Sequence, residues 1–236
     1  MQKLSIIIPV YNEVSTIAQV MHVISNLELI GGIMKEIIVV NDCSTDGTRN
    51  EIETAQVVLK DSSIKVLHHI KNQGKGGAIH TGIREATGDY TIIQDADLEL
   101  EPKEINFLIE AVLNGNADVV YGSRFLGSKV KGGSILSNMA NGFLTRLSNW
   151  IFGIKITDME TCYKLVPTVE FKALNLVEKR FGFEPEITAK LAKNKALNWA
   201  EVPITYNART EAQGKKIGWK DGFRAIWCIL KYGLGK

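Results

Sequence analysis

The chain has 236 residues, 45% of them hydrophobic, and its 28 lysines and arginines nearly balance its 26 aspartates and glutamates. The net charge of +2 argues against nucleic acid as a partner, because bulk binding to a polyanion needs a strongly basic surface. Three widely spaced cysteines without a Cys-x-x-Cys pair argue against a zinc site or a disulfide framework and favour a reducing, cytoplasmic compartment. No segment approaches the roughly 18 apolar residues of a membrane span, and the N-terminus lacks the apolar stretch of a signal peptide. We expect one compact domain over residues 1–236.

Apolar, β-branched segments alternate with segments of helical spacing along the first half of the chain. Strands are predicted at residues 4–10, 36–41, 64–69, 90–94 and 118–121. Helices are predicted between them, at residues 14–29, 48–59, 76–86 and 102–113. A further helix ending at Lys193 and a late strand at residues 199–204 follow. This order predicts an α/β fold with a mostly parallel, Rossmann-like central sheet flanked by helices and joined by right-handed crossovers.

Polar residues follow each of the five predicted strands. The clusters are Tyr11–Glu13, Asp42–Asp46, Asn72–Lys75, Asp95–Glu99 and Ser123–Arg124. Ligands of open parallel sheets bind beyond the carboxyl ends of the strands. Five consecutive strand ends with hydrogen-bonding or charged groups therefore predict a functional site at that edge.

The strongest of these signals is Asp95-Ala96-Asp97, where two carboxylates flank one small residue at the end of a strand. Such a pair suits Mg²⁺, which prefers a few carboxylates together with substrate phosphates. An isolated Asp-x-Asp is more often a solvated acidic loop. Here Glu99 and Glu101 continue the acidic run, and the run would repel itself without a cation.

Three other clusters permit both a functional and a structural interpretation. Asp42, directly at a strand end, could accept from a base N–H or a ribose hydroxyl, whereas Thr45–Thr48 reads equally well as a turn and helix cap. Asn72–Gly77 could offer backbone amides to an anion at a helix start, although it lacks the Walker A spacing. Arg124 has the planar fork that suits phosphate, or it could be a structural arginine.

Taken together, the motifs resemble those of a family 2 glycosyltransferase of GT-A fold. The resemblance rests on the order and spacing of Ser5–Glu13, Asn41–Thr48, Asn72–Gly76, Asp95–Asp97 and Gly122–Arg124. It implies a nucleotide-sugar half at residues 1–124 and an acceptor-binding, membrane-facing half at residues 125–236.

A later segment narrows the resemblance to one branch. Asp158–Lys164 resembles the Asp-x-x-x-Gly-Phe-Lys segment of polyprenyl-phosphate (dolichyl-phosphate) mannosyl- and glucosyltransferases, with Cys162-Tyr163 in place of Gly-Phe. The branch implies metal-dependent, inverting transfer of a hexose from a GDP-mannose or UDP-glucose type of donor to a polyprenyl phosphate. The alternative is transfer to a sugar hydroxyl of a growing glycan, for which Asp158 or Glu160 could serve as general base.

The resemblance also assigns roles to individual residues. Mg²⁺ or Mn²⁺ is expected on Asp95, Asp97 and Glu99, and Asp97, Arg124 and Asp95 are the expected catalytic residues. The expected nucleotide-sugar-binding residues are Pro9, Tyr11, Glu13, Asp42, Lys75, Asp95, Ala96, Asp97 and Arg124.

A phosphate monoester acceptor needs no general base, because its second pKa of about 6 leaves it largely dianionic at neutral pH. It does need basic residues to guide it past the acidic loop. The candidates are Lys129, Lys131, Lys164, Arg209, Lys215 and Lys216, each of which could equally belong to a solvated charged face.

Two amphipathic helices are expected in the C-terminal half. Ile135, Met139, Phe143, Leu147 and Ile151 recur at helical spacing, and a second stripe runs through residues 223–230 beside basic residues. Such stripes usually face a core. They also suit an interfacial helix or a small membrane partner, which would place the protein peripherally at the cytosolic face of a membrane.

Overall fold

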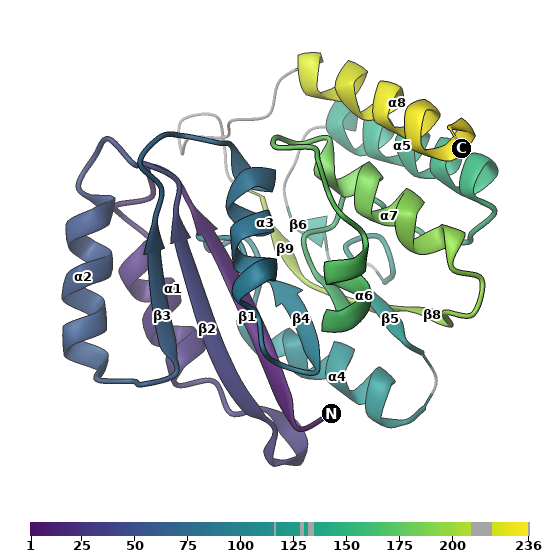
Figure 1. Cartoon of the computed structure of the whole chain (residues 1–236). Coiled ribbons are helices and arrows are strands. Elements are labelled where there is room, and N and C mark those ends of the chain that lie inside the picture. The colour runs from purple at the N-terminus through teal and green to yellow at the C-terminus, as the bar shows by residue number, and fades with distance from the viewer. Residues whose placement is uncertain (116, 128–129, 132–134, 209–218, 236) are drawn as a thin grey trace.

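The computed structural model describes residues 1–115, 117–127, 130–131, 135–208 and 219–235. Its centre is a seven-stranded sheet in the order β3-β2-β1-β4-β7-β5-β8, with helices on both faces (Figure 1). The strands are Lys3–Val10 (β1), Met34–Asn41 (β2), Ile64–His68 (β3), Tyr90–Ile93 (β4), Val119–Ser123 (β5), Lys164–Pro167 (β7) and Trp199–Pro203 (β8). All neighbouring pairs are parallel except those of β7, which runs antiparallel to both β4 and β5. The predicted mostly parallel sheet is confirmed.

Strand β7 was not predicted from the sequence. It has four residues, begins with a lysine, and pairs through only two residues with each neighbour. Such a short strand has too few positions for an alternation or a β-branched run to stand out. Its insertion places a strand from late in the chain between β4 and β5.

The helices follow the predicted order with differences at their ends, except that the short helix at Thr168–Ala173 was not predicted. They are Ile17–Ser25 (α1), Thr48–Leu59 (α2), Lys75–Glu85 (α3), Ile105–Leu113 (α4), Ile135–Phe152 (α5), Thr168–Ala173 (α6), Phe183–Lys193 (α7) and Trp219–Leu234 (α8), with short 3-10 turns at Ile30–Gly32 (η1) and Pro102–Glu104 (η2). The first helix is shorter than the predicted 14–29: residues 14–16 form a turn, and the helix ends at Ser25 with Asn26 as its C-cap. A two-stranded ribbon of Val130–Lys131 (β6) and Tyr206–Asn207 (β9) lies beside the main sheet.

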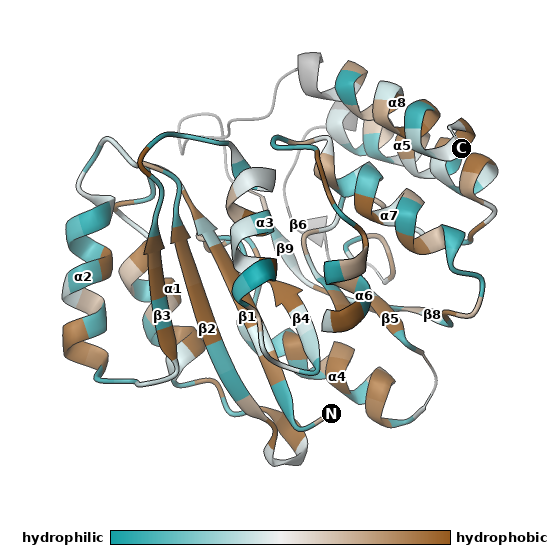
Figure 2. Cartoon of the chain, viewed as in Figure 1, coloured by the Kyte–Doolittle hydropathy of each residue, from teal (hydrophilic) through white to brown (hydrophobic). Residues whose placement is uncertain are grey.

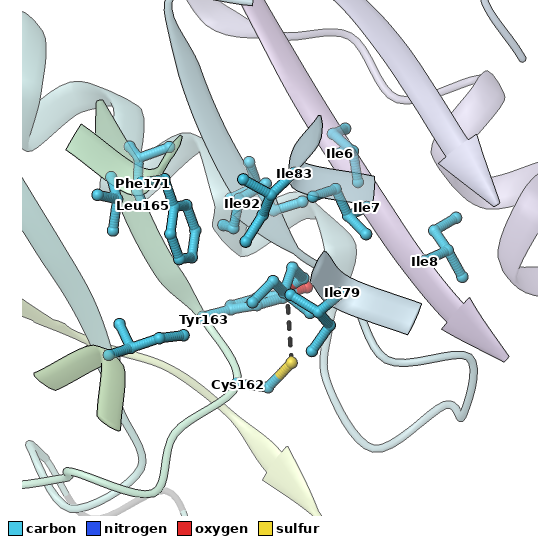
Figure 3. Packing of buried hydrophobic residues seen from close by; sticks show 14 of the residues in the cluster. Ile6, Ile7, Ile8, Ile79, Ile83, Ile92, Cys162, Tyr163, Leu165 and Phe171 are labelled. Carbon is cyan, nitrogen blue, oxygen red and sulfur yellow. Dashed lines mark hydrogen bonds between the residues drawn. The ribbon is translucent and has the colours of Figure 1, made fainter. Parts of the chain in front are cut away.

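Apolar burial is concentrated on the central strands, which stand out as hydrophobic in Figure 2. From Leu4 to Val10 every residue of β1 is buried, as a parallel strand covered on both faces requires. Helix α3 lies over β1 and β2, where Ile83 and Ile79 pack near Ile7 and Ile92 (Figure 3). The core therefore holds the carboxyl ends of β1, β2 and β4 in fixed positions.

The two C-terminal apolar stripes divide between core and surface. Helices α5 and α8 pack on each other and on α7, which buries the side chains of Leu144, Phe152, Cys228 and Ile229. Both helices also present large apolar side chains to solvent: Met139, Phe143 and Trp150 on α5, and Phe223, Trp227, Leu230 and Leu234 on α8. The core interpretation and the surface interpretation thus each account for part of the pattern.

Close packing of α3 on β1 predicts a specific intolerance to side-chain volume. A Cβ atom at Gly82 would lie 2.4 Å from Cγ2 of Ile7, so Gly82→Ala should destabilise the protein by about 1–3 kcal/mol through overpacking. A Cβ at Gly142 in α5 would meet nothing within 4 Å, so Gly142→Ala should stabilise it by up to about 1 kcal/mol. Urea unfolding of both variants measures the two effects, and equal stability of the two would contradict the packing.

Candidate active site

The loops that follow β1 and β2 are fastened to each other at the carboxyl edge of the sheet. Asn12, whose φ is +53°, donates its backbone N–H to Ser44 Oγ at 3.0 Å and accepts from the Thr45 N–H through its side chain at 2.8 Å. The Glu13 N–H donates to Thr48 Oγ1 at 2.9 Å. Of the predicted nucleoside-pocket residues on this loop, Pro9 is buried in the strand and Tyr11 is exposed.

Asp42 lies beneath this edge and is nearly inaccessible, with 2% of its surface exposed. Its Oδ1 accepts from His69 Nδ1 at 2.7 Å and from the Gln73 N–H at 2.8 Å, and its Oδ2 accepts from the Gly74 N–H at 2.7 Å. Two of the loop amides that the sequence analysis considered for anion binding, those of Gln73 and Gly74, therefore donate to the carboxylate of Asp42. Asp42 orders the 72–74 loop, and a contact to a base, the role expected from the resemblance, would have to be made by its remaining acceptor capacity.

The glycines of this loop have a packing role that the sequence did not suggest. A Cβ atom at Gly74 would lie 2.4 Å from the Lys179 carbonyl oxygen, and one at Gly76 would lie 2.3 Å from the Glu178 carbonyl oxygen. The Gly77 N–H donates to the same Lys179 carbonyl at 3.1 Å. Close approach of the 178–179 backbone therefore accounts for glycine at positions 74 and 76.

Asp95 is largely buried and forms an ion pair with Lys75. The ammonium nitrogen of Lys75, the first residue of α3, lies 2.5 Å from its Oδ1, and the two side chains are 24% and 22% exposed. Burial disfavours the charged ammonium, but the nearby Asp95 carboxylate outweighs it and raises the pKa of Lys75. The Asp95 carboxylate at the strand end can thus hold a cation, and in this conformation that cation is the Lys75 ammonium.

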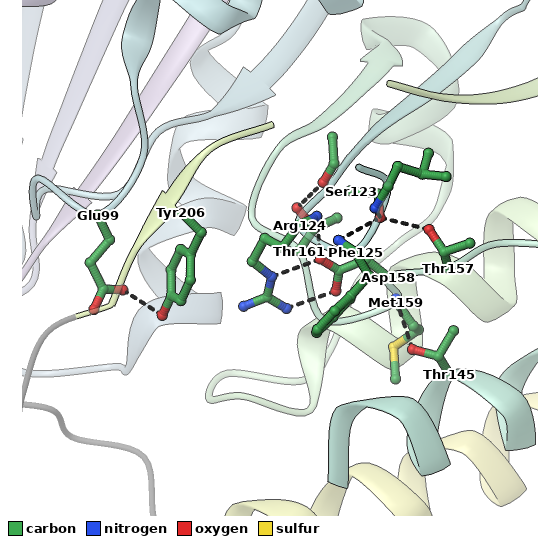
Figure 4. Close-up of polar contacts among 12 residues, drawn as sticks. Glu99, Ser123, Arg124, Phe125, Thr145, Thr157, Asp158, Met159, Thr161 and Tyr206 are labelled. Atoms are coloured by element: carbon green, nitrogen blue, oxygen red, sulfur yellow. Dashed lines mark hydrogen bonds and ion pairs between the residues drawn. The ribbon is translucent and has the colours of Figure 1, made fainter. Parts of the chain in front are cut away.

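The rest of the acidic loop is ordered by a residue that the sequence did not indicate. Tyr206, in β9, donates its hydroxyl to Glu99 Oε2 at 3.0 Å, and its ring centroid lies 5.1 Å from the guanidinium carbon of Arg124 (Figure 4). The Glu99 N–H is 3.3 Å from Asp97 Oδ1. Among the described residues no three acidic, histidine or cysteine side chains converge on one point. Asp95, Asp97 and Glu99 therefore do not form a closed three-ligand cage in this conformation.

Arg124 follows β5 and is bound by Asp158. Arg124 Nε donates to Asp158 Oδ2 at 2.7 Å, and Arg124 Nη2 donates to Asp158 Oδ1 at 2.7 Å (Figure 4). The Arg124 backbone N–H also donates to Asp158 Oδ2, at 3.0 Å. Asp158 is fully buried, and burial, which disfavours the charged guanidinium, is outweighed by Asp158, which raises the pKa of Arg124. This pairing removes Asp158 as an available general base.

Lys164 does not occupy the position expected for an acceptor-binding residue. Its side chain has no exposed surface, and its ammonium is paired with Glu184 of α7 and donates to the Thr161 carbonyl. The expectation fails because Lys164 begins the buried strand β7 and does not lie on a loop. Its charge holds the segment between α5 and β7 in place.

Glu160 is the unused titratable group of this segment. Its Oε1 is buried and has no hydrogen-bond partner among the described residues, although the residue as a whole is partly exposed. Burial raises its pKa to about 7, and the negative charge of Glu184 acts in the same direction. A carboxyl group with a pKa near neutrality, close to Arg124 and Lys164, could exchange a proton at physiological pH; the sequence analysis named Glu160 only as one of two possible bases.

The predicted acceptor lysines and arginines fall partly beyond the described residues. Lys129, Arg209, Lys215 and Lys216 lie outside the part of the chain that the structure describes. The backbone of Lys131 is in β6 and pairs with Asn207, one residue from Tyr206. Strand β9, the partner of β6, contacts the acidic loop, because the Asn207 N–H donates to the Glu99 carbonyl at 2.9 Å.

A fold and a strand-end site of this kind define a class of sugar-transferring proteins, and comparison with known proteins agrees. The chain belongs to glycosyl transferase family 2, whose family model matches residues 5–169. The chain is 39% identical over 244 residues to a dolichol-phosphate mannosyltransferase of Pyrococcus furiosus, covering 98% of this chain and 64% of the relative, so it spans less than two thirds of that protein. It is 30% identical to an undecaprenyl-phosphate mannosyltransferase of Micrococcus luteus, covering 97% of this chain and 93% of the relative.

Solved structures show the same architecture. Glucosyl-3-phosphoglycerate synthase from Mycobacterium tuberculosis superposes with a TM-score of 0.72 at 18% identity, covering 98% of this chain and 81% of that one. Its complex with Mn²⁺, UDP and glucosyl-3-phosphoglycerate gives a TM-score of 0.69 at 17% identity, covering 98% and 80%. These likenesses confirm the expected GT-A fold.

The raised pKa of Glu160 predicts a pH-dependent contribution to stability. The folded protein binds the Glu160 proton more tightly than the unfolded chain, in which glutamate has a pKa of about 4.3. The contribution is therefore present below that value and is lost as pH rises toward 7. The free energy of unfolding of Glu160→Gln minus that of wild type should therefore be larger at pH 8 than at pH 5, as measured by urea unfolding.

A control separates this effect from the general pH response of the fold. The pKa of Glu85 is lowered by its hydrogen bond and ion pair with Lys65. Glu85→Gln should therefore not gain stability relative to wild type between pH 5 and pH 8. A Glu160→Gln curve parallel to wild type across this range would show that Glu160 is ionised in the folded state.

Proposed function

We propose that the protein transfers a hexose from a nucleotide-diphosphate sugar to a polyprenyl phosphate, in a metal-dependent reaction with inversion at the anomeric carbon. The observation that carries the proposal is the Asp95 carboxylate, which is 22% exposed at the strand end and already pairs with one cation, the Lys75 ammonium. The family and the two mannosyltransferase relatives support the reaction class and the lipid phosphate. The GDP-mannose and UDP-glucose types of donor both remain within the proposal.

On the donor side, the diphosphate would lie over the Asp95–Asp97 loop. Asp95 and Asp97 would hold Mg²⁺ or Mn²⁺, and solved neighbours of the fold were crystallised with UDP and either ion. The bound ion would neutralise charge on the leaving diphosphate. Lys75 and Arg124 would add to that neutralisation, with Glu99 and Tyr206 fixing the loop.

On the acceptor side, the site suits a nucleophile that is already anionic. A phosphate monoester needs no base, since it is largely dianionic above a pKa of about 6. Asp158 is occupied by Arg124, so the chain does not present it for proton abstraction. The basic residues that would guide the phosphate are Lys131, whose backbone pairs with β9, and the predicted residues at 129, 209, 215 and 216.

Glu160 supports a second candidate function, transfer to a sugar hydroxyl. Its unpartnered Oε1 and its pKa of about 7 are the properties of a general base at neutral pH. In that case Glu160→Gln should abolish transfer to a hydroxyl acceptor. Transfer to a phosphate acceptor should survive the same change, so the two functions make opposite predictions for one variant.

The exposed stripes on α5 and α8 fit a membrane surface. Within the part of the chain that the structure describes, no helix is long and apolar enough to cross a bilayer. Phe223, Trp227, Leu230 and Leu234 recur every three or four residues and share one face of α8. Arg224 and Lys231 lie 4.4 and 4.5 Å from the Trp227 ring centroid, which places cations beside the apolar face. We propose that this face lies on the cytosolic surface of the membrane that holds the lipid acceptor.

The reaction is tested with UDP- and GDP-sugars and a short polyprenyl phosphate. Wild type should form the glycosyl lipid with Mg²⁺ or Mn²⁺ and lose the activity in excess EDTA. Asp97→Ala should reduce transfer roughly 10²-fold or more, because the loss of several kcal/mol of charge stabilisation is expected. Asp89→Ala, which removes a carboxylate at the opposite end of β4, should keep transfer. Undiminished transfer in EDTA would contradict the metal requirement, and no product from any donor would contradict the function.

The membrane face is tested by sedimentation with vesicles of anionic phospholipid. A triple variant should bind vesicles less well than wild type; its changes are Phe143→Ser, Trp150→Ser and Phe223→Ser. Each of these side chains is more than half exposed, so each substitution removes apolar contact with the membrane. Val57→Ser with Val58→Ser removes equally exposed apolar surface from α2 and should leave binding unchanged. Equal losses in both variants would show that the effect is not specific to α5 and α8.

A further inference from the structure

Lys75 occupies the carboxylate that the proposed reaction assigns to the metal. It begins α3 directly after Gly74, whose φ of +85° turns the chain toward Asp95. Its ammonium lies 2.5 Å from Asp95 Oδ1 and 6.0 Å from the Phe183 ring centroid. The side chain is thus held on one side by an aromatic ring and on the other by the first carboxylate of the Asp95-Ala96-Asp97 motif.

The two carboxylates that act on Lys75, Asp95 and Glu184, each have an ammonium partner within the protein. Glu184 acts electrostatically on Lys75 and is itself paired with the buried Lys164. Two carboxylates, Asp95 and Glu184, therefore face two ammonium groups, Lys75 and Lys164. A metal ion that binds alone must displace the Lys75 ammonium from Asp95. The displaced ammonium is then largely buried and no longer paired with Asp95, which is unfavourable.

We propose that Lys75 is a positioning residue that holds Asp95 until the metal arrives together with the nucleotide diphosphate, and that its ammonium then passes to the diphosphate. This inference rests on the proposed function, since it assumes a metal and a diphosphate at this site. A metal–diphosphate complex brings the anion that the displaced ammonium needs. Lys75 therefore opposes binding of the metal alone and favours binding of the nucleotide, which couples the two events.

The proposal predicts two effects of opposite sign from one substitution. Lys75→Met keeps an unbranched side chain and removes the charge. Mn²⁺ alone should then bind about five- to ten-fold more tightly, as expected for loss of one partly exposed ion pair of roughly 1–1.4 kcal/mol. The nucleoside diphosphate should bind about ten-fold more weakly in the presence of Mn²⁺, because a charge-assisted contact is lost. A lysine that merely stabilised the loop would weaken both ligands together.

The experiment measures ligand affinity and does not depend on turnover. Electron paramagnetic resonance gives the Mn²⁺ dissociation constant of the protein without nucleotide, and calorimetry gives those of UDP and GDP at saturating Mn²⁺. Lys65→Met is the matched control: it breaks an ion pair with Glu85 of the same 2.5 Å length away from the site, and should change neither affinity. Lys75→Arg keeps a cation and should keep weak binding of Mn²⁺ alone.

The outcomes separate this inference from the proposed function. Tighter Mn²⁺ and weaker nucleotide binding in Lys75→Met support the exchange. Unchanged or weaker Mn²⁺ binding in Lys75→Met, with normal Mn²⁺-dependent nucleotide binding by wild type, overturns the exchange and leaves the proposed function standing. If wild type binds neither UDP nor GDP with Mn²⁺, the proposed function and the exchange both fall.

A measurement on wild type guards against a misfolded variant. The Nζ resonance of Lys75, assigned in ¹⁵N-labelled protein, should move when Mg²⁺ and the nucleotide are added together. The resonance of Lys65 should stay in place under the same conditions. A Lys75 signal that does not respond while nucleotide binds would show that the ammonium remains on Asp95.

Discussion

The buried pair of Lys164 and Glu184 is the interaction on which the site depends. The Lys164 side chain has no exposed surface and that of Glu184 is only 6% exposed, so each charge requires the other, and removal of one would leave an uncompensated ion in the core. The pair joins β7 to α7, and the Thr161 carbonyl accepts from the same ammonium. The segment that carries Asp158 and Glu160 is therefore fixed between α5 and β7, and the orientation of Arg124 follows from it.

Carboxylates at the strand ends are likewise paired with basic or histidine side chains. Asp42 accepts from His69, Asp95 from Lys75 and Asp158 from Arg124, so each of these carboxylates has a partner supplied by a different loop. The site is thus ordered before any ligand is bound. Glu178 connects it to the exposed face, because its carbonyl lies against Gly76 while its carboxylate accepts from Arg224 and Tyr232 of α8. Contacts made by α8 can reach the Lys75 loop through one residue.

The sequence predicted the parallel part of the fold and the order of the strand-end clusters, because β-branched runs and helical spacing are local signals. It did not predict β7, which is too short to show a pattern. Within the candidate site, Asp95 and Arg124 were predicted from motifs, but the residues that pair with them could not be predicted in this way. Tyr206 contacts Glu99 across 107 positions, and Lys164 became buried because Glu184 meets it from α7. Such pairings are properties of the tertiary fold and leave no local signature.

The insertion of β7 between β4 and β5 also sets an order for folding during synthesis. Strand β4 gains its second neighbour only when residues 164–167 have left the ribosome, more than seventy residues after β4 itself. Until then β4 presents an unpaired, apolar edge of the kind that pairs with other chains. During this interval the open edge of β4 is a site at which the nascent protein can pair with other chains or bind a chaperone.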